Sequence, residues 1–377
     1  MDFFMLISLL GGLALFLYGM TMLGSGLEKF SGGRLEQTLE KMTDSTIKGV
    51  ALGALVTAAI QSSSATTVIV VGLVNARILK LRQAIGVIMG ANIGTTITAH
   101  ILRLSDISSD NFFINLLKPA TLAPLVGLIG ILLLMVGNNQ KRKNFGEILL
   151  GFCILFTGMF NMEAAVSPLA DSPEFMALFS SLSNPVLGVL AGAGVTALIQ
   201  SSAASIGILQ ALSMTGVLTF GSVYAIIIGV NIGDCVTTAI VCSIGSKADA
   251  KRTGVVHIIF NLCASVIIIT ALTVLHHAGA LDGLWGQTMT SGAIANVHTI
   301  FRLSTAVLLL PVCGQFEKLS RVLVKDDQQI GENVDHELSQ LDEKFFASPA
   351  LALSAASDAI GAMARLARTG VMSALDV

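Results

Sequence analysis

Charged residues are scarce in this chain of 377 residues, and their scarcity excludes an ordinary soluble domain. Only 12% of the residues are charged, against about a quarter in soluble globular proteins. The mean hydropathy is +0.80, and 53% of the residues are hydrophobic. Charge-free tracts at 3–27, 49–76 and 254–281 are long enough to cross a lipid bilayer as helices. The composition therefore predicts an all-α integral membrane protein.

Several functional signatures are also missing. The five cysteines include no paired Cys-x-x-Cys, which argues against a disulfide framework or a zinc site. The net charge of −2 gives no electrostatic reason to expect a nucleic-acid partner. There is no Gly-x-Ser-x-Gly elbow, no His-Glu-x-x-His motif and no pair of carboxylates within the spans that is suited to acid–base work. The sequence therefore points away from an enzyme and implies no organic cofactor.

What the chain does contain is an internal repeat. Residues 49–66 (GVALGALVTAAIQSSSAT) and 188–205 (GVLAGAGVTALIQSSAAS) agree at 12 of 18 positions with an offset of 139. The same offset relates the Gly-Met of 19–20 to that of 158–159, and the Asn-Ile-Gly of 92–94 to that of 231–233. Each copy places a polar Gln-Ser-Ser cluster inside an apolar segment. Paired, interrupted hydrophobic segments of this kind indicate the binding site of a transporter.

The apolar tracts predict seven spanning helices, at about 3–26, 83–103, 113–137, 146–166, 221–243, 254–275 and 290–313. The repeated segments, about 47–76 and 186–215, are long enough either to cross once or to enter and return as helical hairpins. Cytoplasmic loops collect Lys and Arg, so basic residues distinguish the two arrangements. With both segments re-entrant, 13 basic residues fall on one side and only Arg103 and Lys118 on the other. We therefore expect two re-entrant hairpins.

Each repeat then contributes three crossings, and an odd number inverts the second repeat relative to the first. The hairpins enter from opposite faces, and we expect their tips to meet near the middle of the bilayer. Non-helical backbone at that depth must be buried in protein or line a water-filled cavity. The basic side is expected to be the cytoplasmic face of a plasma membrane, such as a bacterial inner membrane, with the N-terminus outside.

The hairpin tips carry the residues for which we expect ligand binding. They are Gln61, Ser62, Ser63, Ser64 and Thr66 in the first copy and Gln200, Ser201, Ser202 and Ser205 in the second. The start of each returning half-helix offers partial positive charge and free N–H groups, which favour an anion. Amide, hydroxyl and freed carbonyl oxygens suit a hard cation such as sodium. The alternative is that these hydroxyls only bond to backbone carbonyls or to neighbouring helices.

A second repeated pair of polar clusters lies in the helix that follows each hairpin. It comprises Asn92, Thr95 and Thr96 in the first copy and Asn231 and Asp234 in the second. The glycines beside each Asn predict local unwinding that exposes carbonyls, and the alternative is a packing notch. A carboxylate inside a span, such as Asp234, is by default an ion ligand or a proton carrier.

Later helices offer polar residues that could line the same interior: His257 with Asn261, and Asn296, His298 and Arg302. Residues 257–262 (HIIFNL) and 298–303 (HTIFRL) echo each other. Residues four apart share a helix face, so each His and the fourth residue after it could face inward together. We expect Arg302 to pair either with Asp234 or with the substrate.

On these grounds the chain divides into three parts. The first membrane repeat covers 1–137, the second covers 138–315 with the last helix, and a cytoplasmic helical tail covers 316–377. The tail is polar and acidic over 325–343 and apolar-periodic over 351–375. The first apolar tract has no basic leader and no evident cleavage site, so we expect a retained span.

The doubled QSS(S/A) segment, with a GxNIG segment after each copy, resembles the sodium–phosphate cotransporter family over about residues 1–315. The resemblance implies an inverted repeat with two re-entrant hairpins and coupled transport of sodium with inorganic phosphate, both held at the tips. We accordingly expect phosphate at Ser62, Ser63, Ser64, Ser201, Ser202, Asn92 and Asn231, and sodium at Gln61, Gln200, Thr66, Thr95, Thr96, Ser205 and Asp234. The tail resembles the start of a PhoU-type helical domain. In the second copy Ala203 replaces Ser64 and Asp234-Cys235 replaces Thr95-Thr96, which leaves the number of sodium ions open.

Other functions remain compatible with the sequence. A sodium-coupled carrier of another anion, such as a dicarboxylate, would use similar serine-rich hairpins, and a phosphate exporter would look the same. A reading from another class is a membrane regulatory protein that senses phosphate and signals through the tail. A homo-oligomer is also compatible.

Overall fold

The computed structural model describes residues 3–31, 45–75, 78–106, 118–243, 248–325 and 352–361, together with residues 116, 363 and 364. Within these ranges the chain is helical apart from turns and one isolated β-bridge between Thr219 and Thr288. Seven helical runs are long and apolar enough to cross a membrane: Phe3–Phe30, Leu81–Asp106, Pro119–Val136, Gln140–Asp171, Phe220–Ile240, Ala248–His277 and Ser291–Leu323. The predicted all-α membrane fold with seven spans is confirmed.

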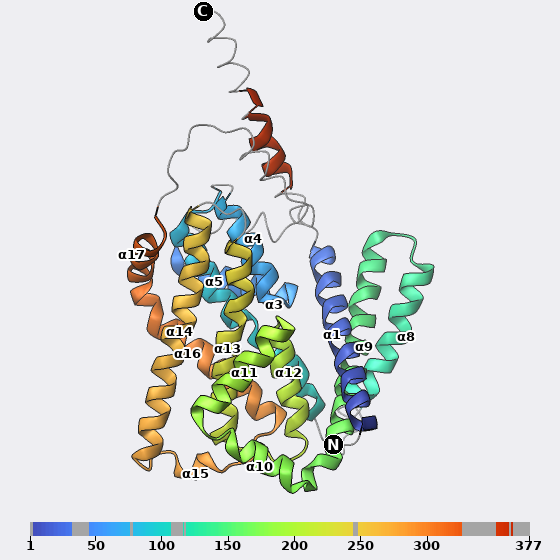
Figure 1. Ribbon diagram of the computed structural model, residues 1–377. Helices are drawn as coiled ribbons and strands as arrows, with labels where there is room; N and C mark the ends of the chain where they lie inside the picture. Colours follow the sequence, from blue (N-terminus) through green and yellow to red (C-terminus); the bar gives the residue numbers. More distant parts are fainter. Residues whose placement is uncertain are drawn as a thin grey trace, which may run out of the picture.

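The helices follow the same order twice (Figure 1). The first series is α1 (Phe3–Ser31), the hairpin α3 (Thr46–Ile60) and α4 (Ser63–Asn75), α5 (Leu81–Gly94) with α6 (Thr96–Leu102), and α8 (Pro119–Val136). The second is α9 (Gln140–Val166), the hairpin α11 (Pro185–Ile199) and α12 (Ser202–Ser213), α13 (Phe220–Ser243) and α14 (Ala248–His277). The bundle is completed by α16 (Ser291–Leu309), η3 (Leu310–Val312) and α17 (Cys313–Leu323). Short connecting helices are η1 (Arg103–Asp106), η2 (Ser167–Asp171), α10 (Pro173–Ser181) and α15 (Asp282–Trp285).

Helices α1 and α9, which open the two series, pack against each other in opposite directions. A Cβ atom added at Gly19 would lie 2.2 Å from the backbone nitrogen of Leu155, and one at Gly158 would lie 2.2 Å from that of Phe16. Gly158 follows Gly19 by 139 residues, and Leu155 follows Phe16 by the same interval, so one contact occurs twice with its partners exchanged. Because one residue number falls as the other rises, the helices are antiparallel. The second repeat is therefore inverted, as predicted.

Each repeated segment turns back on itself. The hydroxyl of Thr57 in α3 donates to that of Thr66 in α4 over 2.9 Å, and Thr196 in α11 donates to Ser205 in α12 over 2.8 Å. Nine residues of continuous helix would hold such side chains about 13 Å apart, so the chain must reverse between them. The reversals lie at Gln61 and Gln200, whose φ angles are 59° and 57°. The hairpin helices are 12 to 15 residues long, too short to span a bilayer.

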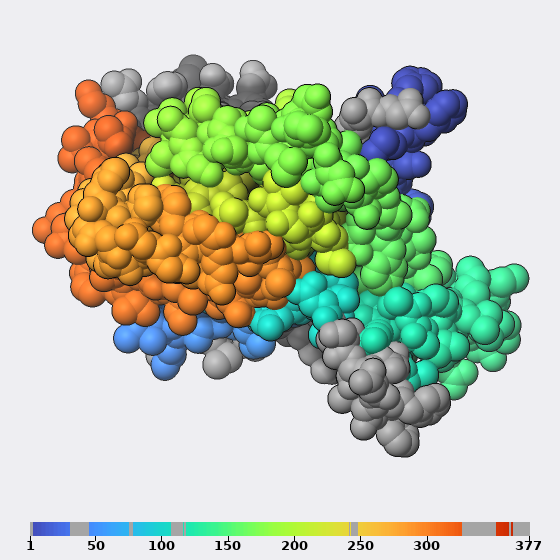
Figure 2. All heavy atoms as spheres, turned by 90° about the horizontal axis from the view of Figure 1, so that it is seen from below, coloured from blue at the N-terminus to red at the C-terminus, as the bar shows by residue number. Residues whose placement is uncertain are grey.

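The exposed apolar side chains of α8 indicate which surface of the protein contacts lipid. In Figure 2 α8 stands out at a corner of the molecule, away from the hairpins. Large apolar side chains on α8 are exposed: Leu125, Leu128, Ile129, Leu132 and Met135. An apolar helix face of this size is unfavourable in water and suits the hydrocarbon core of a bilayer.

The structure hardly shows the unwinding predicted around the two Asn-Ile-Gly segments. In the first copy the interruption is limited to Thr95, between α5 and α6, which keeps helical φ and ψ angles of −58° and −27°, whereas α13 runs unbroken through the second copy. The glycines act instead as packing notches. A Cβ atom at Gly90 would lie 1.9 Å from the carbonyl oxygen of Val50, and one at Gly229 would lie 2.1 Å from that of Val189. They let the entering helix of each hairpin lie directly against the spanning helix that follows.

The last span is longer than predicted. It was expected to end at 313, yet α17 continues to Leu323, and the buried guanidinium of Arg252 donates to the carbonyl of Val324 over 3.1 and 2.9 Å. The first residues of the predicted tail therefore pack against the start of α14. Residues 326–351 and 365–377 of that tail lie outside the described residues, as do the basic residues Arg34, Lys41, Arg77 and Lys247. The division into three parts stays a prediction.

Candidate functional site

The two hairpin tips are built by the same hydrogen bonds. The Ser62 hydroxyl accepts from the N–H of Ala65 over 3.1 Å, and the Ser201 hydroxyl accepts from the N–H of Ala204 over 3.2 Å. These bonds cap α4 and α12. The hydroxyls of Thr66 and Ser205 donate to the carbonyls of the same two serines, over 3.0 and 3.1 Å.

The partners Thr57 and Thr196 were not predicted as tip residues. They are identical and stand at the same place in both copies of the repeat, which is the signal that could have identified them. Thr66 and Ser205 each accept one hydrogen bond, so each hydroxyl oxygen keeps one acceptor lone pair. Each tip can therefore offer oxygen atoms to a cation, while the start of the returning helix offers N–H groups to an anion.

The glutamines at the turns are not equivalent. Gln61 is buried, its carbonyl oxygen accepts from the hydroxyl of Thr98 over 3.0 Å, and its amide donates to the carbonyl of Ala58. Gln200 has the same backbone conformation but an exposed side chain. The first tip is thus tied to α6 through its glutamine side chain.

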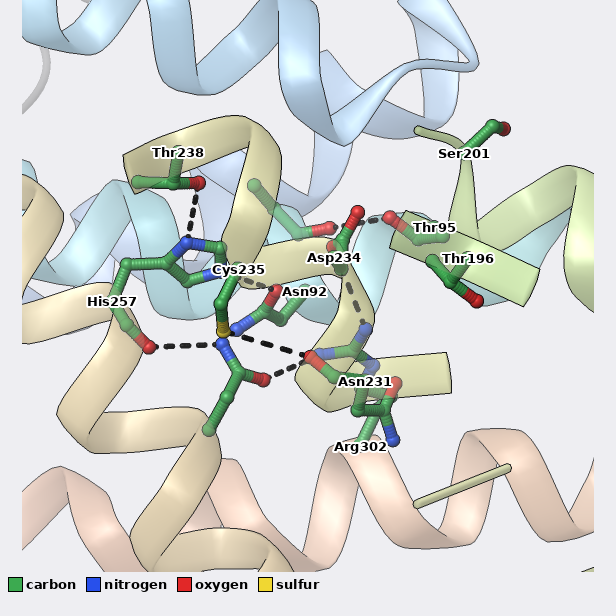
Figure 3. Close-up of polar contacts among 12 residues, drawn as sticks. Asn92, Thr95, Thr196, Ser201, Asn231, Asp234, Cys235, Thr238, His257 and Arg302 are labelled. Carbon is green, nitrogen blue, oxygen red and sulfur yellow. Dashed lines mark hydrogen bonds and ion pairs between the residues drawn. The ribbon is translucent and has the colours of Figure 1, made fainter. Parts of the chain in front are cut away.

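A buried polar network lies beside the second tip (Figure 3). His257 on α14 shares hydrogen bonds with the hydroxyl of Thr238, 2.7 Å from Nδ1, and with Oδ1 of Asn92, 3.3 Å from Nε2. Asn261 donates to the His257 carbonyl over 2.9 Å and accepts from Nη1 of Arg302 over 2.9 Å. The chain of contacts ends at the carboxylate of Asp234, 3.8 Å from Nη2 of Arg302. Residues from α5, α13, α14 and α16 therefore converge at one place.

This network is nearly closed to solvent but incompletely hydrogen-bonded. Asn92, Asp234, His257, Asn261 and Arg302 are at most 3% exposed. Polar atoms among them have no hydrogen-bond partner within the described part of the chain: Nδ2 of Asn92, Oδ1 of Asp234, and Nε and Nη2 of Arg302. Burying polar groups without partners is costly. These atoms are therefore the ones that a polar ligand would satisfy.

The other predicted residues on the spanning helices differ in how their polar atoms are bonded. Asn231 is fully buried and neither atom of its amide has a partner among the described residues; the same holds for both ring nitrogens of His298. The hydroxyls of Thr95 and Thr96 donate to the carbonyls of Ala91 and Ile93 in their own helix turn. These two hydroxyls therefore bond within their own helix, as hydroxyls in membrane helices often do.

Asn296 does not line the interior, which corrects the prediction. It is exposed, and its carbonyl oxygen accepts from the guanidinium of Arg103 over 2.9 Å. Asn296 precedes His298 by two residues, and two residues turn a helix by about 200°, so the two side chains face opposite ways. The expected pairing of Arg302 with Asp234 is present. Thr238, which bonds to His257, was missed, and nothing in the repeat marks it.

Comparisons with known proteins agree with this architecture. The family model for Na+/Pi-cotransporter matches the chain twice, over residues 15–164 and 158–285. The uncharacterised protein YqeW of Bacillus subtilis is 29% identical over 324 residues, covering 85% of this chain and 98% of YqeW. The putative inorganic phosphate export protein YjbB of Escherichia coli is 24% identical over 353 residues, covering 93% of this chain and 61% of YjbB.

Another relative is matched over one segment only. Human sodium-dependent phosphate transport protein 2B is 35% identical over 132 residues, 34% of this chain and 19% of that protein. The chain thus spans less than two thirds of the length of YjbB and of the human protein. No solved structure matches the chain.

Proposed function

The chain belongs to the Na+/Pi-cotransporter family, and from that premise we propose that it carries inorganic phosphate across a membrane together with sodium by alternating access. The observation that carries the proposal is the pair of matching hairpin tips beside a buried, incompletely bonded polar network. Inverted repeats whose broken helices meet at a polar site are the usual architecture of such carriers.

Electrostatics supports an anion at this place. A phosphate dianion cannot enter hydrocarbon without compensating charge. The starts of α4 and α12 bring partial positive charge, and Arg302, whose own charge faces Asp234 over 3.8 Å, adds N–H donors. Serine hydroxyls at the same helix starts, Ser63 and Ser202, are buried. Together these groups offer several donors to phosphate oxygens without exposing them to lipid.

Sodium would supply both charge compensation and driving force. Each positive charge that moves down a potential of 100 mV gains about 2.3 kcal/mol, which sustains roughly a fifty-fold gradient. The oxygens of Thr66 and Ser205 and the carbonyls that end α3 and α11 are the groups proposed to hold it. Sodium and phosphate should each raise the affinity for the other by the same factor.

The direct test is uptake of radiolabelled phosphate into proteoliposomes with an inward sodium gradient, compared with an equal potassium gradient. Ser63→Ala and Ser202→Ala should each lower the phosphate flux. Ser181→Ala, an exposed serine on α10 that bonds only within its own turn, is the matched control and should transport normally. Phosphate flux that is equally fast without sodium would end the coupling proposal. Competition by arsenate but not by succinate would separate phosphate from dicarboxylate transport.

Export is a second candidate, because the relative that covers 93% of this chain is named a putative phosphate export protein. Vesicles preloaded with phosphate can report efflux with sodium on either side.

A protein that only senses phosphate and regulates another process should bind phosphate without any flux. Because residues up to Val324 pack on α14, the chain should be shortened after Lys325. A transporter should keep its flux in that variant, whereas a sensor that signals through the tail should lose its output.

A further inference from the structure

Two charged residues interrupt the internal symmetry, and they face each other. Asp234 stands where the first repeat has Thr95, and Arg302 stands where the echoed segment of α14 has Asn261. In the structure Nη2 of Arg302 lies 3.8 Å from Oδ2 of Asp234, and the two side chains are 1% and 3% exposed. The two departures from a neutral pattern therefore form one buried ion pair.

The pair lies directly behind the second tip, where the spanning helix that follows the hairpin packs against it. A Cβ atom at Gly233 would lie 2.7 Å from Cβ of Thr196, so Asp234 follows a residue in contact with α11. Figure 3 shows Asp234 and Arg302 turned toward each other, with Thr196 nearby and Ser201 directed away.

The equivalent place behind the first tip is neutral. A Cβ atom at Gly94 would lie 2.7 Å from Cβ of Thr57, the same contact as in the second copy. The next residue, Thr95, donates its hydroxyl proton to the Ala91 carbonyl over 3.1 Å. The first tip therefore has no carboxylate behind it at this position, and the second tip has one with a cation already beside it.

The hydrogen-bonding capacity of the pair is not filled, as it would be in a purely structural salt bridge. A buried ion pair offsets its desolvation only with close geometry and full hydrogen bonding. Here the charged atoms stand 3.8 Å apart, and Nε and Nη2 of Arg302 and Oδ1 of Asp234 have no hydrogen-bond partner within the described residues. A guanidinium has five N–H donors in a fixed fork, so Arg302 keeps donors for a second anion while it compensates Asp234.

We propose that the Arg302 guanidinium is a tethered cation that occupies, beside Asp234, the position where a sodium ion would otherwise bind, and that it presents its remaining donors to phosphate. Asp234 is then a positioning residue for Arg302 rather than a sodium ligand, which differs from the role expected from the sequence. The inference rests on the proposed sodium-coupled transport. It predicts that no sodium ion is held by Asp234.

The test counts sodium in full-length protein with Asp234→Asn. We expect D234N to bind the same number of sodium ions as the wild type and to show the same steepness of phosphate uptake against sodium concentration. Its maximal uptake should fall, because Arg302 loses its positioning partner. Loss of one bound sodium ion in D234N, with uptake still sodium-dependent, would show that Asp234 is a ligand and would overturn the inference.

The complementary variants act on Arg302. Arg302→Asn leaves the carboxylate alone, and we expect it to gain about one sodium ion per transporter. Arg302→Lys, the conservative control, should keep the wild-type sodium number. Equal sodium numbers in R302N and R302K would contradict the inference. If R302N cannot be purified, R302Q carries the same comparison, and D234N alone remains decisive.

The result also separates this inference from the proposed function. Wild-type phosphate uptake that ignores sodium would remove the coupling itself. Sodium-dependent uptake with a sodium ion bound by Asp234 would remove only the tethered cation.

Discussion

The two hairpin tips share the hydrogen bonds that shape the turn, but the helices behind them differ. Thr57–Thr66 and Thr196–Ser205 are bonded alike, and both turns use a glutamine with positive φ. Behind the first tip the helix is interrupted at Thr95, while behind the second it continues through Asp234. The turn is thus determined locally, by residues within a short stretch of chain. The charge that a ligand meets is determined by helices from elsewhere in the sequence.

The strongest test of this comparison concerns the packing that both copies share. Gly53→Leu and Gly192→Leu should each prevent folding. The new Cβ atom would lie 2.0 Å from the carbonyl oxygen of Val87 in the first variant and 2.1 Å from that of Ile226 in the second. Backbone cannot move aside as a flexible side chain can. Size-exclusion chromatography in detergent should show loss of the monodisperse protein. Gly194→Leu is the control for Gly192→Leu on α11. Nothing lies within 4 Å of its Cβ position, so this variant should remain folded.

The two buried asparagines should separate stability from transport. Asn92→Leu removes an acceptor for His257 and should cost about 1–3 kcal/mol of unfolding free energy. Asn231→Leu removes an amide that has no partner among the described residues, so stability should hardly fall. Both should lower phosphate flux if both amides contact the substrate. Equilibrium unfolding in mixed detergents, with uptake measured in parallel, would check this; an equally large stability loss for Asn231→Leu would contradict it.

The hydroxyl pairs should behave alike in the two copies. Thr57→Val and Thr196→Val each delete one donor and should each destabilise the protein by about 1 kcal/mol. Thermal unfolding in detergent would compare the two variants directly. A shift in the midpoint for one copy and none for the other would break the equivalence of the tips.

The glutamines should give the smallest effects, and unequal ones. Gln61→Ala removes the acceptor for the buried hydroxyl of Thr98 and should cost about 1 kcal/mol. Gln200 is exposed, so Gln200→Ala should change stability by less than about 0.5 kcal/mol. The same thermal measurement applies. Equal losses would mean that the side chain of Gln200 is also bonded in the folded protein.

The sequence predicted most of the fold because the evidence for it is local or periodic. The length of apolar runs determines the spans, the constant offset of 139 reveals the repeat, and the distribution of basic residues indicates that both segments return. The predicted helix break at Gln-Ser-Ser is confirmed in both copies. The predicted unwinding beside Asn231 was wrong, because a glycine that packs closely and a glycine that breaks a helix look the same in a sequence.

The sequence by itself thus determined an inverted pair of serine-tipped hairpins in a membrane. Only the tertiary structure decided which polar residues share a site. It placed Arg302 beside Asp234, joined His257 to Asn92 across 165 residues, and turned Asn296 toward Arg103 instead. Such contacts depend on how each helix is rotated and which helix lies next to it. Those choices are made by packing between distant segments, and no spacing within a single segment records them.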